Sequence, residues 1–267
     1  MTTGFIGVGN MGGALLRGML TSGALPGKSA WCCDTSPAKA SAFKSEFGVS
    51  VAGNPAELAR DCDLIILAVK PDAAAAVLAS IADALDEKKI VLSIVLGLSV
   101  VKITELTGGK CRVVRVMPNT PALVRAGMLC VSFGDGLSDG EKDAVTALLA
   151  SCGEVEVLEE KLLSRITGLT ASSPAYVFIM LEAMADAAVR NGVPRATAIR
   201  LAAQTVLGSA KMALETGEHP GRLKDNVCSP SGSTIEAVRV LEDRGFRSAL
   251  IEAVIACDAK AAEYSEK

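Results

Sequence analysis

The chain has 267 residues, enough for about two domains with a sizeable core. Hydrophobic residues make up 50% of it but aromatic residues only 3%, so the core must be built from aliphatic side chains. The formal net charge is −3 and no cluster of basic residues stands out, which argues against nucleic-acid binding. The longest apolar stretch, 90–101, is too short to span a bilayer, and we expect no signal peptide.

The cysteines give no sign of a metal site. None of the eight belongs to a C-x-x-C pair, and His219 is the only histidine, so we expect no bound metal. Most of them lie in apolar surroundings, as small core residues do. Thiols used in this way predict a cytoplasmic protein without membrane association.

The most specific motif lies near the start of the chain. Residues 4–8 form a short apolar run that suits a buried strand, and 14–20 continue as a helix after Gly7, Gly9 and Gly12. Strand, G-x-G-x-x-G turn and helix form the dinucleotide-binding fingerprint. The first glycine permits a tight turn, the second lets the backbone approach a pyrophosphate, and the third lets helix and strand pack closely. The helix N-terminus then offers N–H groups to the phosphates.

Short apolar runs alternate with helical segments up to about residue 160, which predicts an α/β domain with a parallel sheet. The runs are continuous, as expected of strands buried on both faces. After the first strand they cover 30–33, 64–69, 90–95, 112–116 and 128–133, with helices over 73–85 and 139–152.

The second part of the chain reads as long, Ala-rich helices. We expect helices over 175–191, 195–216, 234–244 and 246–264, with a loop over 219–232. The predicted organisation is therefore a Rossmann dinucleotide-binding domain over 1–160 and a helical domain over 161–267. Glu182, Asp186 and Arg190 form a charged stripe on the first of these helices. The stripe suits either a solvated face or an acidic site at a subunit interface.

Ligands of an open parallel sheet bind beyond the carboxyl ends of its strands. Three predicted strands end in unusual residues at that edge, namely 34–37, Lys70 with Pro71, and a rigid turn over 118–121 that presents Asn119. We expect these ends to form the rim of the cofactor site.

The second of the predicted strands leaves the choice of cofactor open. Asp34 lies near the usual distance from Gly12 for an acid that binds the adenine ribose of NAD. Thr35 and Ser36 suit the 2′-phosphate of NADP instead, and Lys39 could help to neutralise it.

A second informative stretch covers 226–236. Ser233 and Glu236 form the S-x-x-E pattern of a capping box, which predicts a helix from Thr234. The preceding loop is rich in Ser, Pro and Gly, and a small-residue loop at a helix N-terminus suits the binding of a carboxylate. An ordinary capped surface helix is the alternative.

Together these motifs resemble the pyrroline-5-carboxylate reductase family along essentially the whole chain. The matching stretches are 4–12, 68–71, 115–124, 172–178, 215–221 and 228–236. The resemblance implies a Rossmann domain followed by an all-α dimerisation domain that interleaves with a second subunit. It implies homodimers that assemble into a larger ring such as a decamer. It also implies that NADPH, or NADH as the alternative donor, reduces the C=N bond of 1-pyrroline-5-carboxylate to L-proline.

The resemblance also assigns roles to individual residues. Thr234 would be catalytic, because its hydroxyl would hydrogen-bond the ring nitrogen, and a cyclic imine needs little more than that and good positioning. The implied substrate-binding residues are Glu160, Asn226, Ser229, Gly232, Ser233 and Thr234. The implied cofactor-binding residues are Gly7, Val8, Gly9, Asn10, Met11, Gly12, Ser36, Asn54, Ala68, Val69, Lys70, Pro71, Leu96 and Asn119.

The chain departs from the common family pattern in four places. Ala171 and Ser231 replace glycines, 95–96 replaces an Ala-Ala pair, and Asp34 is not the usual residue. None of these changes removes a reacting group, so we expect them to affect cofactor preference more than activity. Two other functions remain open. A β-hydroxyacid dehydrogenase shares the opening motif but would carry a lysine near 171–174, and a dinucleotide sensor would bind cofactor without turnover.

Overall fold

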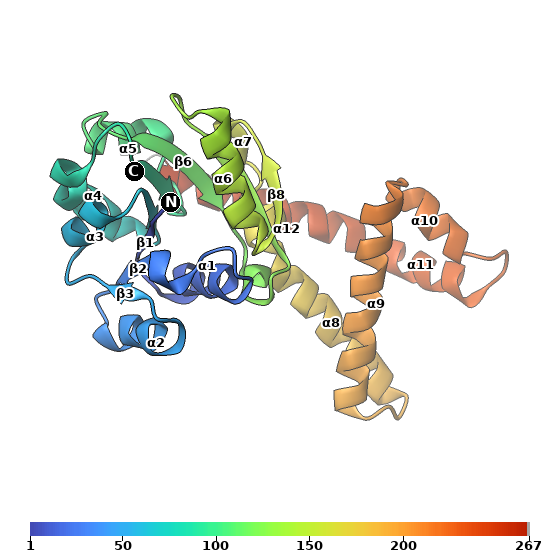
Figure 1. Cartoon of the computed structure of the whole chain (residues 1–267). Coiled ribbons are helices and arrows are strands. Elements are labelled where there is room, and N and C mark those ends of the chain that lie inside the picture. The colour runs from blue at the N-terminus through green and yellow to red at the C-terminus, as the bar shows by residue number, and fades with distance from the viewer. Residues whose placement is uncertain (266–267) are drawn as a thin grey trace. The chain divides into compact units, whose positions relative to one another are not determined.

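The computed structural model describes residues 1–265, and its chain divides into two compact units (Figure 1). The first unit comprises Met1–Ser172 and the chain from Ala256 onward, and the second comprises Ser173–Ile255. The domain boundary predicted at residue 160 stays a prediction. Of the described helices, none combines the length and the apolar character needed to cross a membrane.

The first unit contains a mixed sheet that has eight strands within the described residues, in the order β3-β2-β1-β4-β5-β6-β7-β8. The run β3-β2-β1-β4-β5-β6 is that of a doubly wound dinucleotide-binding domain, so the α/β prediction is confirmed. The strands are β1 (Thr3–Ile6), β2 (Ala30–Cys33), β3 (Ser50–Val51), β4 (Leu64–Leu67), β5 (Ile90–Ser93), β6 (Arg112–Met117), β7 (Gly127–Phe133) and β8 (Gly153–Val157).

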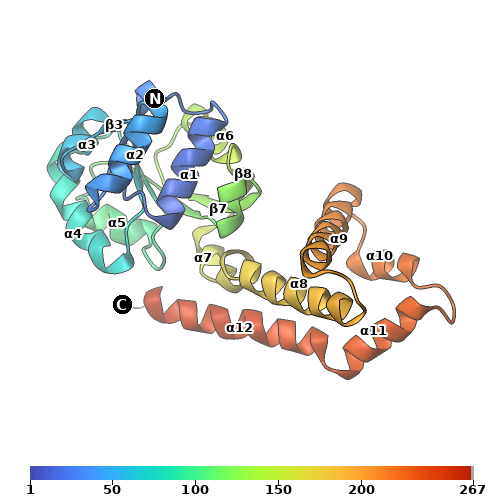
Figure 2. The ribbon, with the colours of Figure 1, turned by 90° about the horizontal axis from the view of Figure 1, so that it is seen from below.

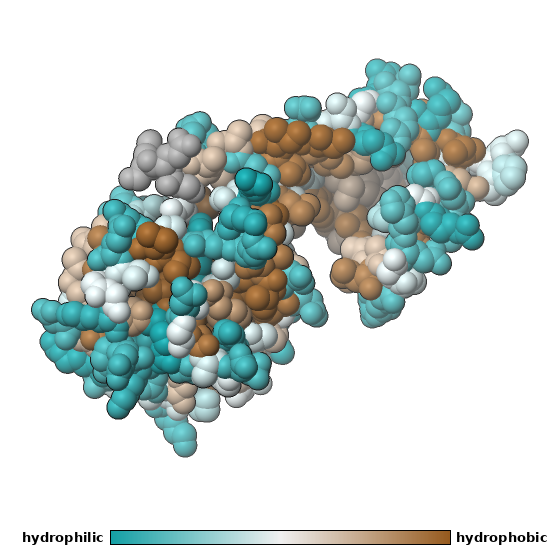
Figure 3. Space-filling view, turned by 90° about the horizontal axis from the view of Figure 1, so that it is seen from above, coloured by the Kyte–Doolittle hydropathy of each residue, from teal (hydrophilic) through white to brown (hydrophobic). Residues whose placement is uncertain are grey.

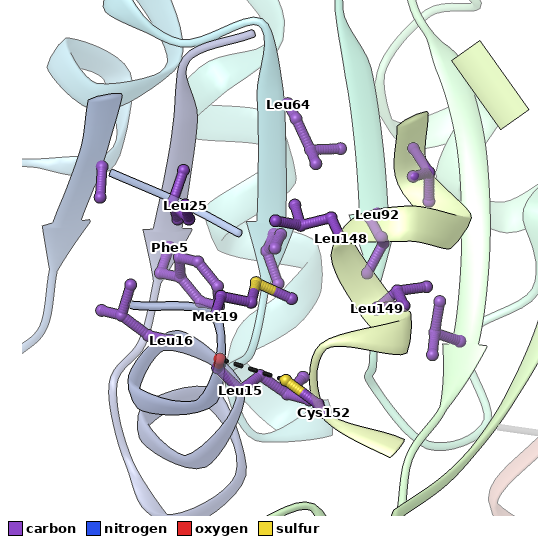
Figure 4. Close-up of a cluster of buried hydrophobic side chains, with 14 of the residues drawn as sticks. Phe5, Leu15, Leu16, Met19, Leu25, Leu64, Leu92, Leu148, Leu149 and Cys152 are labelled. Carbon is purple, nitrogen blue, oxygen red and sulfur yellow. Dashed lines mark hydrogen bonds between the residues drawn. The ribbon is translucent and has the colours of Figure 1, made fainter. Parts of the chain in front are cut away.

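Helices cover both faces of this sheet. One core contains side chains from α1 (Asn10–Thr21), α2 (Pro37–Phe47) and α6 (Asp139–Ala150). The other contains side chains from α3 (Pro55–Asp61), α4 (Pro71–Ile81) and α5 (Val100–Leu106). Because side chains alternate along a strand, Phe5 belongs to the first core and Ile6 to the second. Figure 4 shows the first core, where the Cys152 thiol donates to the Leu15 carbonyl over 3.5 Å.

The sheet corrects the sequence prediction in two ways. The strand β7 runs antiparallel to β6, so the sheet is not wholly parallel. The connection between them, 118–126, is too short for a parallel crossover, which needs a dozen or more residues. The edge strands β3 and β8 were missed, because β3 spans only two residues and β8 alternates glutamate with valine.

The second unit is helical, with α8 (Ser173–Arg190), α9 (Arg195–Thr216), α10 (Pro220–Val227), α11 (Ser233–Asp243) and the first part of α12 (Phe246–Ser265). Helices α8 and α9 lie side by side as a hairpin (Figures 1 and 2). Asp186 pairs with Arg195 across that hairpin, and Glu182, Asp186 and Arg190 are all exposed in the single chain. The interface interpretation of the charged stripe stays open.

The predicted loop over 219–232 is wrong, because it contains helix α10. Pro220 occupies the first helical position, where its missing N–H costs nothing. The ring of His219 accepts a hydrogen bond from the Gly221 amide at 3.1 Å and so caps the helix. A histidine cap is not one of the usual sequence signals for a helix start.

Candidate functional site

The three glycines of the first turn occupy three different environments. A Cβ on Gly7, whose φ is +93°, would lie 2.4 Å from the Ala68 carbonyl oxygen. A Cβ on Gly12 would lie 2.3 Å from the Gly7 carbonyl oxygen, whereas one on Gly9 would meet nothing within 4 Å. Gly7 and Gly12 therefore permit close packing, and Gly9 faces open space. Helix α1 has no side-chain cap and no acidic residue in its first turn. Its N-terminus thus fits a pyrophosphate.

The glycine turn lies where the strand order reverses, between β1 and β4. The Gly7 amide donates to the Cys33 carbonyl at 2.8 Å, which ties the turn to the end of β2. Asp34 strengthens that tie, because its Oδ2 accepts from the Val8 amide and its Oδ1 from the Ser36 amide, both at 2.8 Å. Asp34 therefore stabilises both the glycine turn and the turn after β2, independently of any contact with a ribose.

The start of α2 is open to an anion. Ser36 is the N-cap residue, but its side chain makes no capping hydrogen bond. The first turn of α2 contains no acidic residue, and Lys39 is its third residue. A hydroxyl, a helix N-terminus and a cation thus occur together after β2, which suits a phosphate group.

Other predicted cofactor residues also have structural duties. Asn54 caps α3, with its Oδ1 accepting from the Glu57 amide at 2.9 Å. Lys70 is the exposed N-cap residue of α4, and Pro71 follows it in the first turn. Asn119 is buried, and its Oδ1 accepts from the Met128 amide at 2.9 Å while its Nδ2 donates to the Thr170 carbonyl at 3.0 Å. The Asn119 side chain therefore holds two backbone segments in place, since its oxygen and its nitrogen are both bonded within the protein.

A pocket of about 300 Å³ adjoins the glycine turn through Met11. Its walls come from the ends of β5 and β6, from α7 (Glu160–Leu163) and from the π-helix Thr167–Ala171. Leu96, a predicted cofactor residue, lines it together with Met11. Val95 and Ala171 line it too, so two of the four departures from the common family pattern fall in one pocket.

Glu160 stands beside this pocket in an internal network. Its Oε1 accepts from the Val100 amide at 2.7 Å and from Arg115 Nη1 at 3.1 Å. Arg115 lines the pocket and its side chain is only 11% exposed, so the ion pair is mostly shielded from water. Sequence reasoning missed Arg115, although a charged residue within the apolar run of β6 was a usable signal.

The predicted capping box on α11 is wrong. Gly232, with an extended backbone, is the N-cap residue, so Ser233 is already the first helical residue. Glu236 accepts from Arg239 at 2.8 and 3.0 Å instead of turning back to the helix start. Consequently no side chain caps α11, and its first amides keep their capacity to bind an anion.

The turn before α11 is tightly built. Ser231 has φ +58°, a left-handed conformation that favours glycine. A Cβ on Gly232 would lie 2.3 Å from Ser229 Oγ, so only glycine fits there without a shift. Asn226 lies outside this turn, near the end of α10. The structure thus brings Ser229, Gly232, Ser233 and Thr234 together in the second unit, whereas Glu160 belongs to the first.

Cys33 and Cys62 are buried free thiols rather than reactive groups. All eight cysteines are unpaired, and burial raises the pKa of Cys33 and of Cys62 to about 12. Thiols with such pKa values stay protonated and are poor nucleophiles. The described residues also contain no group of three or more His, Cys, Asp or Glu that could hold a metal ion.

Comparison with known proteins agrees with this geometry. Residues 2–97 match the family model described as NADP oxidoreductase, coenzyme F420-dependent, and residues 160–264 match that of pyrroline-5-carboxylate reductase dimerisation. The fold and the site therefore define an NADP-binding oxidoreductase with a C-terminal helical dimerisation domain. The chain is 47% identical to pyrroline-5-carboxylate reductase of Escherichia coli over 98% of both proteins. It is 39% identical to that of Glycine max over 99% of this chain and 96% of the relative. The chain belongs to the pyrroline-5-carboxylate reductase family.

Solved structures point the same way. A pyrroline-5-carboxylate reductase from Coxiella burnetii is 34% identical, with a TM-score of 0.91 over 100% of this chain and 99% of that one. A pyrroline carboxylate reductase from Plasmodium falciparum, solved with NADP bound, is 32% identical, with a TM-score of 0.89 over 99% and 98%. The predicted activity, a reductase of proline biosynthesis, is confirmed by this relationship.

Proposed function

We propose that the chain uses NADPH in preference to NADH to reduce the C=N bond of 1-pyrroline-5-carboxylate, giving L-proline. The glycine turn carries the proposal, because Gly9 faces open space at an uncapped helix N-terminus and a 300 Å³ pocket adjoins that turn. The bound nicotinamide would supply the hydride. The chain's own residues would bind the cofactor and the substrate, orient them and donate hydrogen bonds to them.

The cofactor residues fall into two groups by task. Residues 7–12 would hold the pyrophosphate on the N-terminus of α1, although the Val8 amide is already engaged by Asp34. Ser36 and Lys39 would bind the 2′-phosphate at the start of α2, which favours NADPH. Asn54, Ala68–Pro71, Leu96 and Asn119 would form the rim, with Asn119 acting through the residues it holds.

The substrate carboxylate would bind at the N-terminus of α11, whose first amides lack a side-chain cap. Ser229, Gly232 and Ser233 shape that turn, and Asn226 would add a polar group from the end of α10. Thr234 Oγ1 would donate a hydrogen bond to the ring nitrogen. That bond strengthens as the hydride arrives, because the nitrogen becomes an amine. Glu160 would act through Arg115, since its carboxylate is already bonded within the protein.

The proposed assembly is a homodimer that forms a larger ring such as a decamer. Residues 160–264 match a dimerisation family, and the second unit exposes apolar side chains that include Phe178 and Ile179. A cytoplasmic location would keep the free cysteines reduced. Sedimentation of the purified protein would measure the size of the particle directly.

Coupled oxidation of NADPH or NADH, with pyrroline-5-carboxylate as acceptor, tests the donor and the catalytic residue together. We expect kcat/KM to favour NADPH by about tenfold or more, which is about 1.4 kcal/mol. Thr234→Ala should lower kcat by about a hundredfold, whereas Thr234→Ser should retain most of it because the hydroxyl remains. Ser233→Ala is the matched control and should change kcat by less than about threefold.

The opposite results have clear meanings. A tenfold or greater preference for NADH would overturn the proposed donor and show that Asp34 governs the ribose site. A Thr234→Ala variant with near wild-type kcat would show that the proton comes from elsewhere, such as water. A wild-type protein that oxidises a β-hydroxyacid with NADP but leaves pyrroline-5-carboxylate unchanged would overturn the proposed reaction.

A further inference from the structure

The π-helix Thr167–Ala171 forms part of the wall of the pocket, because Thr167, Ala171 and the following Ser172 all line it. A π-helix is rare and occurs mostly as a single turn, frequently at functional sites. A single turn has few hydrogen bonds of its own, so the position of this wall depends on the groups that bind its backbone.

Within the part of the chain that the structure describes, two side chains from distant parts of the first unit bind that backbone. Asn119, between β6 and β7, donates from Nδ2 to the Thr170 carbonyl at 3.0 Å. Asp258, on α12, accepts from the Gly168 amide at 2.6 Å through its Oδ1. Gly168 is buried and lies in the first turn of the π-helix.

Helix α12 meets this wall through three neighbouring residues, Cys257, Asp258 and Ala261. The Cys257 thiol donates to Ser172 Oγ at 3.1 Å, and Ala261, only 6% exposed, lines the pocket itself. This part of α12 thus belongs to the unit that holds the glycine turn and contributes to its pocket. A carboxylate is the stronger acceptor for a buried amide, because a charged group makes a shorter and stronger hydrogen bond.

We infer that Asp258 is a positioning residue for the reduction. Through its bond to the Gly168 amide it holds the π-helix in place, and so it sets the shape of the pocket wall at Thr167 and Ala171. This inference rests on the proposed function in taking the pocket as the place where the nicotinamide binds. Asp258 itself need not touch either reactant. Its effect would appear in the alignment of the reacting atoms, where small displacements are costly.

Three variants of the full-length protein test the inference. Asp258→Ala removes the acceptor, Asp258→Asn keeps an acceptor oxygen without the charge, and Glu263→Ala removes an exposed carboxylate of the same helix that pairs with Lys260. Each is examined by hydrogen–deuterium exchange of peptides covering 164–172, by fluorescence titration with NADPH and by steady-state kinetics. Circular dichroism confirms that each variant is folded.

We expect Asp258→Ala to speed exchange in this segment by about tenfold or more, because the buried Gly168 N–H loses its bond to the Asp258 carboxylate. Its kcat should fall by about tenfold or more, while the Kd for NADPH changes by less than about threefold, since positioning rather than binding is lost. Asp258→Asn should recover kcat to within about threefold of wild type, and Glu263→Ala should match wild type.

Any of three outcomes would overturn the role given to Asp258. These are unchanged exchange in Asp258→Ala, wild-type kcat in spite of faster exchange, or an Asp258→Asn variant as impaired as Asp258→Ala. A wild-type protein that fails to bind NADPH or to reduce pyrroline-5-carboxylate would instead contradict the proposed function. The exchange measurement on the free protein would then still decide whether Asp258 holds the wall.

Discussion

The two units of the molecule bury their apolar side chains to very different extents. In the first, Phe5, Leu15 and the whole of β4 are fully buried, with the sheet between two cores. In the described part of the second, the buried side chains are those of Ala185, Ala198 and Ala202. Phe178 is 62% exposed and Leu214 83% exposed, and Figure 3 shows hydrophobic residues gathered in patches on the surface.

This contrast separates two sources of stability. A unit with complete cores is stabilised by its own burial of apolar surface. A helical unit that leaves large apolar side chains exposed needs another surface to cover them, as patches of this kind usually indicate. Because residues 160–264 match a dimerisation family, the partner proposed above is a second copy of the chain. Substitutions in the core of the first unit should therefore lower its free energy of unfolding. Substitutions of exposed apolar residues in the second unit should instead weaken the assembly.

The largest effect is expected in the core of the first unit. Leu15→Ala should lower the free energy of unfolding by about 2–5 kcal/mol, because Leu15 is fully buried and the site cannot collapse completely. Urea denaturation measures the change. Leu123→Ala is the matched control, since Leu123 is 60% exposed in the same unit, and it should cost less than about 0.5 kcal/mol. Equal costs would contradict the placement of this core.

The next effect concerns binding rather than folding. Gly9→Asp should weaken the binding of NADPH at least about a hundredfold, or about 2.7 kcal/mol, because it places a carboxylate against the pyrophosphate. The fold should survive, because a side chain at Gly9 meets no protein atom within 4 Å. Gly140→Asp makes the same change at an equally open site at the start of α6 and should leave binding unchanged. Normal NADPH titration of Gly9→Asp would refute this placement of the cofactor.

A surface substitution in the second unit probes the other half of the contrast. Ile179 on α8 is 68% exposed, and Ile179→Glu should weaken dimerisation by about 2 kcal/mol if a second copy covers that residue. Analytical ultracentrifugation over a range of concentrations measures the shift. Val124→Glu, at a residue that is 76% exposed in the first unit, should leave the assembly intact. If Ile179→Glu also leaves it intact, this face of α8 is not the interface.

A smaller effect should appear in cofactor choice. Asp34→Asn removes a negative charge near the proposed 2′-phosphate site but keeps one oxygen that can accept from a backbone amide. The ratio of kcat/KM for NADPH to that for NADH should rise by about tenfold, or about 1.4 kcal/mol. Asp61→Asn, at an exposed residue at the end of α3, is the control. An unchanged ratio would show that the charge of Asp34 does not influence the choice between NADPH and NADH.

The smallest effect is expected at the turn before α11. Ser231→Gly should stabilise the protein by about 0.5–1 kcal/mol, because a left-handed conformation is strained for serine and easy for glycine. The same change at Ser209, exposed within α9, should have the opposite sign and cost about 0.5 kcal/mol. Thermal unfolding of both variants checks the pair. Two changes of the same sign would rule out strain at Ser231.

Much of the fold could be predicted because its signals are local. The glycine turn needs Gly7 at a positive φ and needs no Cβ at Gly12, so its chemistry is written in a few adjacent residues. The run over 64–67 is apolar throughout because β4 is buried on both faces. Helix α9 was predicted with the bounds it has, Arg195–Thr216, since Pro194 and Gly217 mark its ends.

The capping error arose between two local options, whereas the role of Asp34 depends on a distant contact. The Ser233–Glu236 pattern is a sound capping signal, yet Gly232 takes the cap and Glu236 pairs with Arg239. In the sequence, Asp34 was a candidate for binding the adenine ribose of NAD. Only the fold shows that its two carboxylate oxygens accept from the amides of Val8 and Ser36.

What the sequence determined by itself is the α/β class, the dinucleotide turn, the helical second half and, through its motifs, the family. What the tertiary structure decided is the bond from Arg115 to Glu160 and the bond from Gly168 to Asp258. The physical reason is the range of the interactions. Strand burial, glycine conformation and helix periodicity act over a few residues, whereas these bonds join residues far apart in the chain and exist only once the chain has folded.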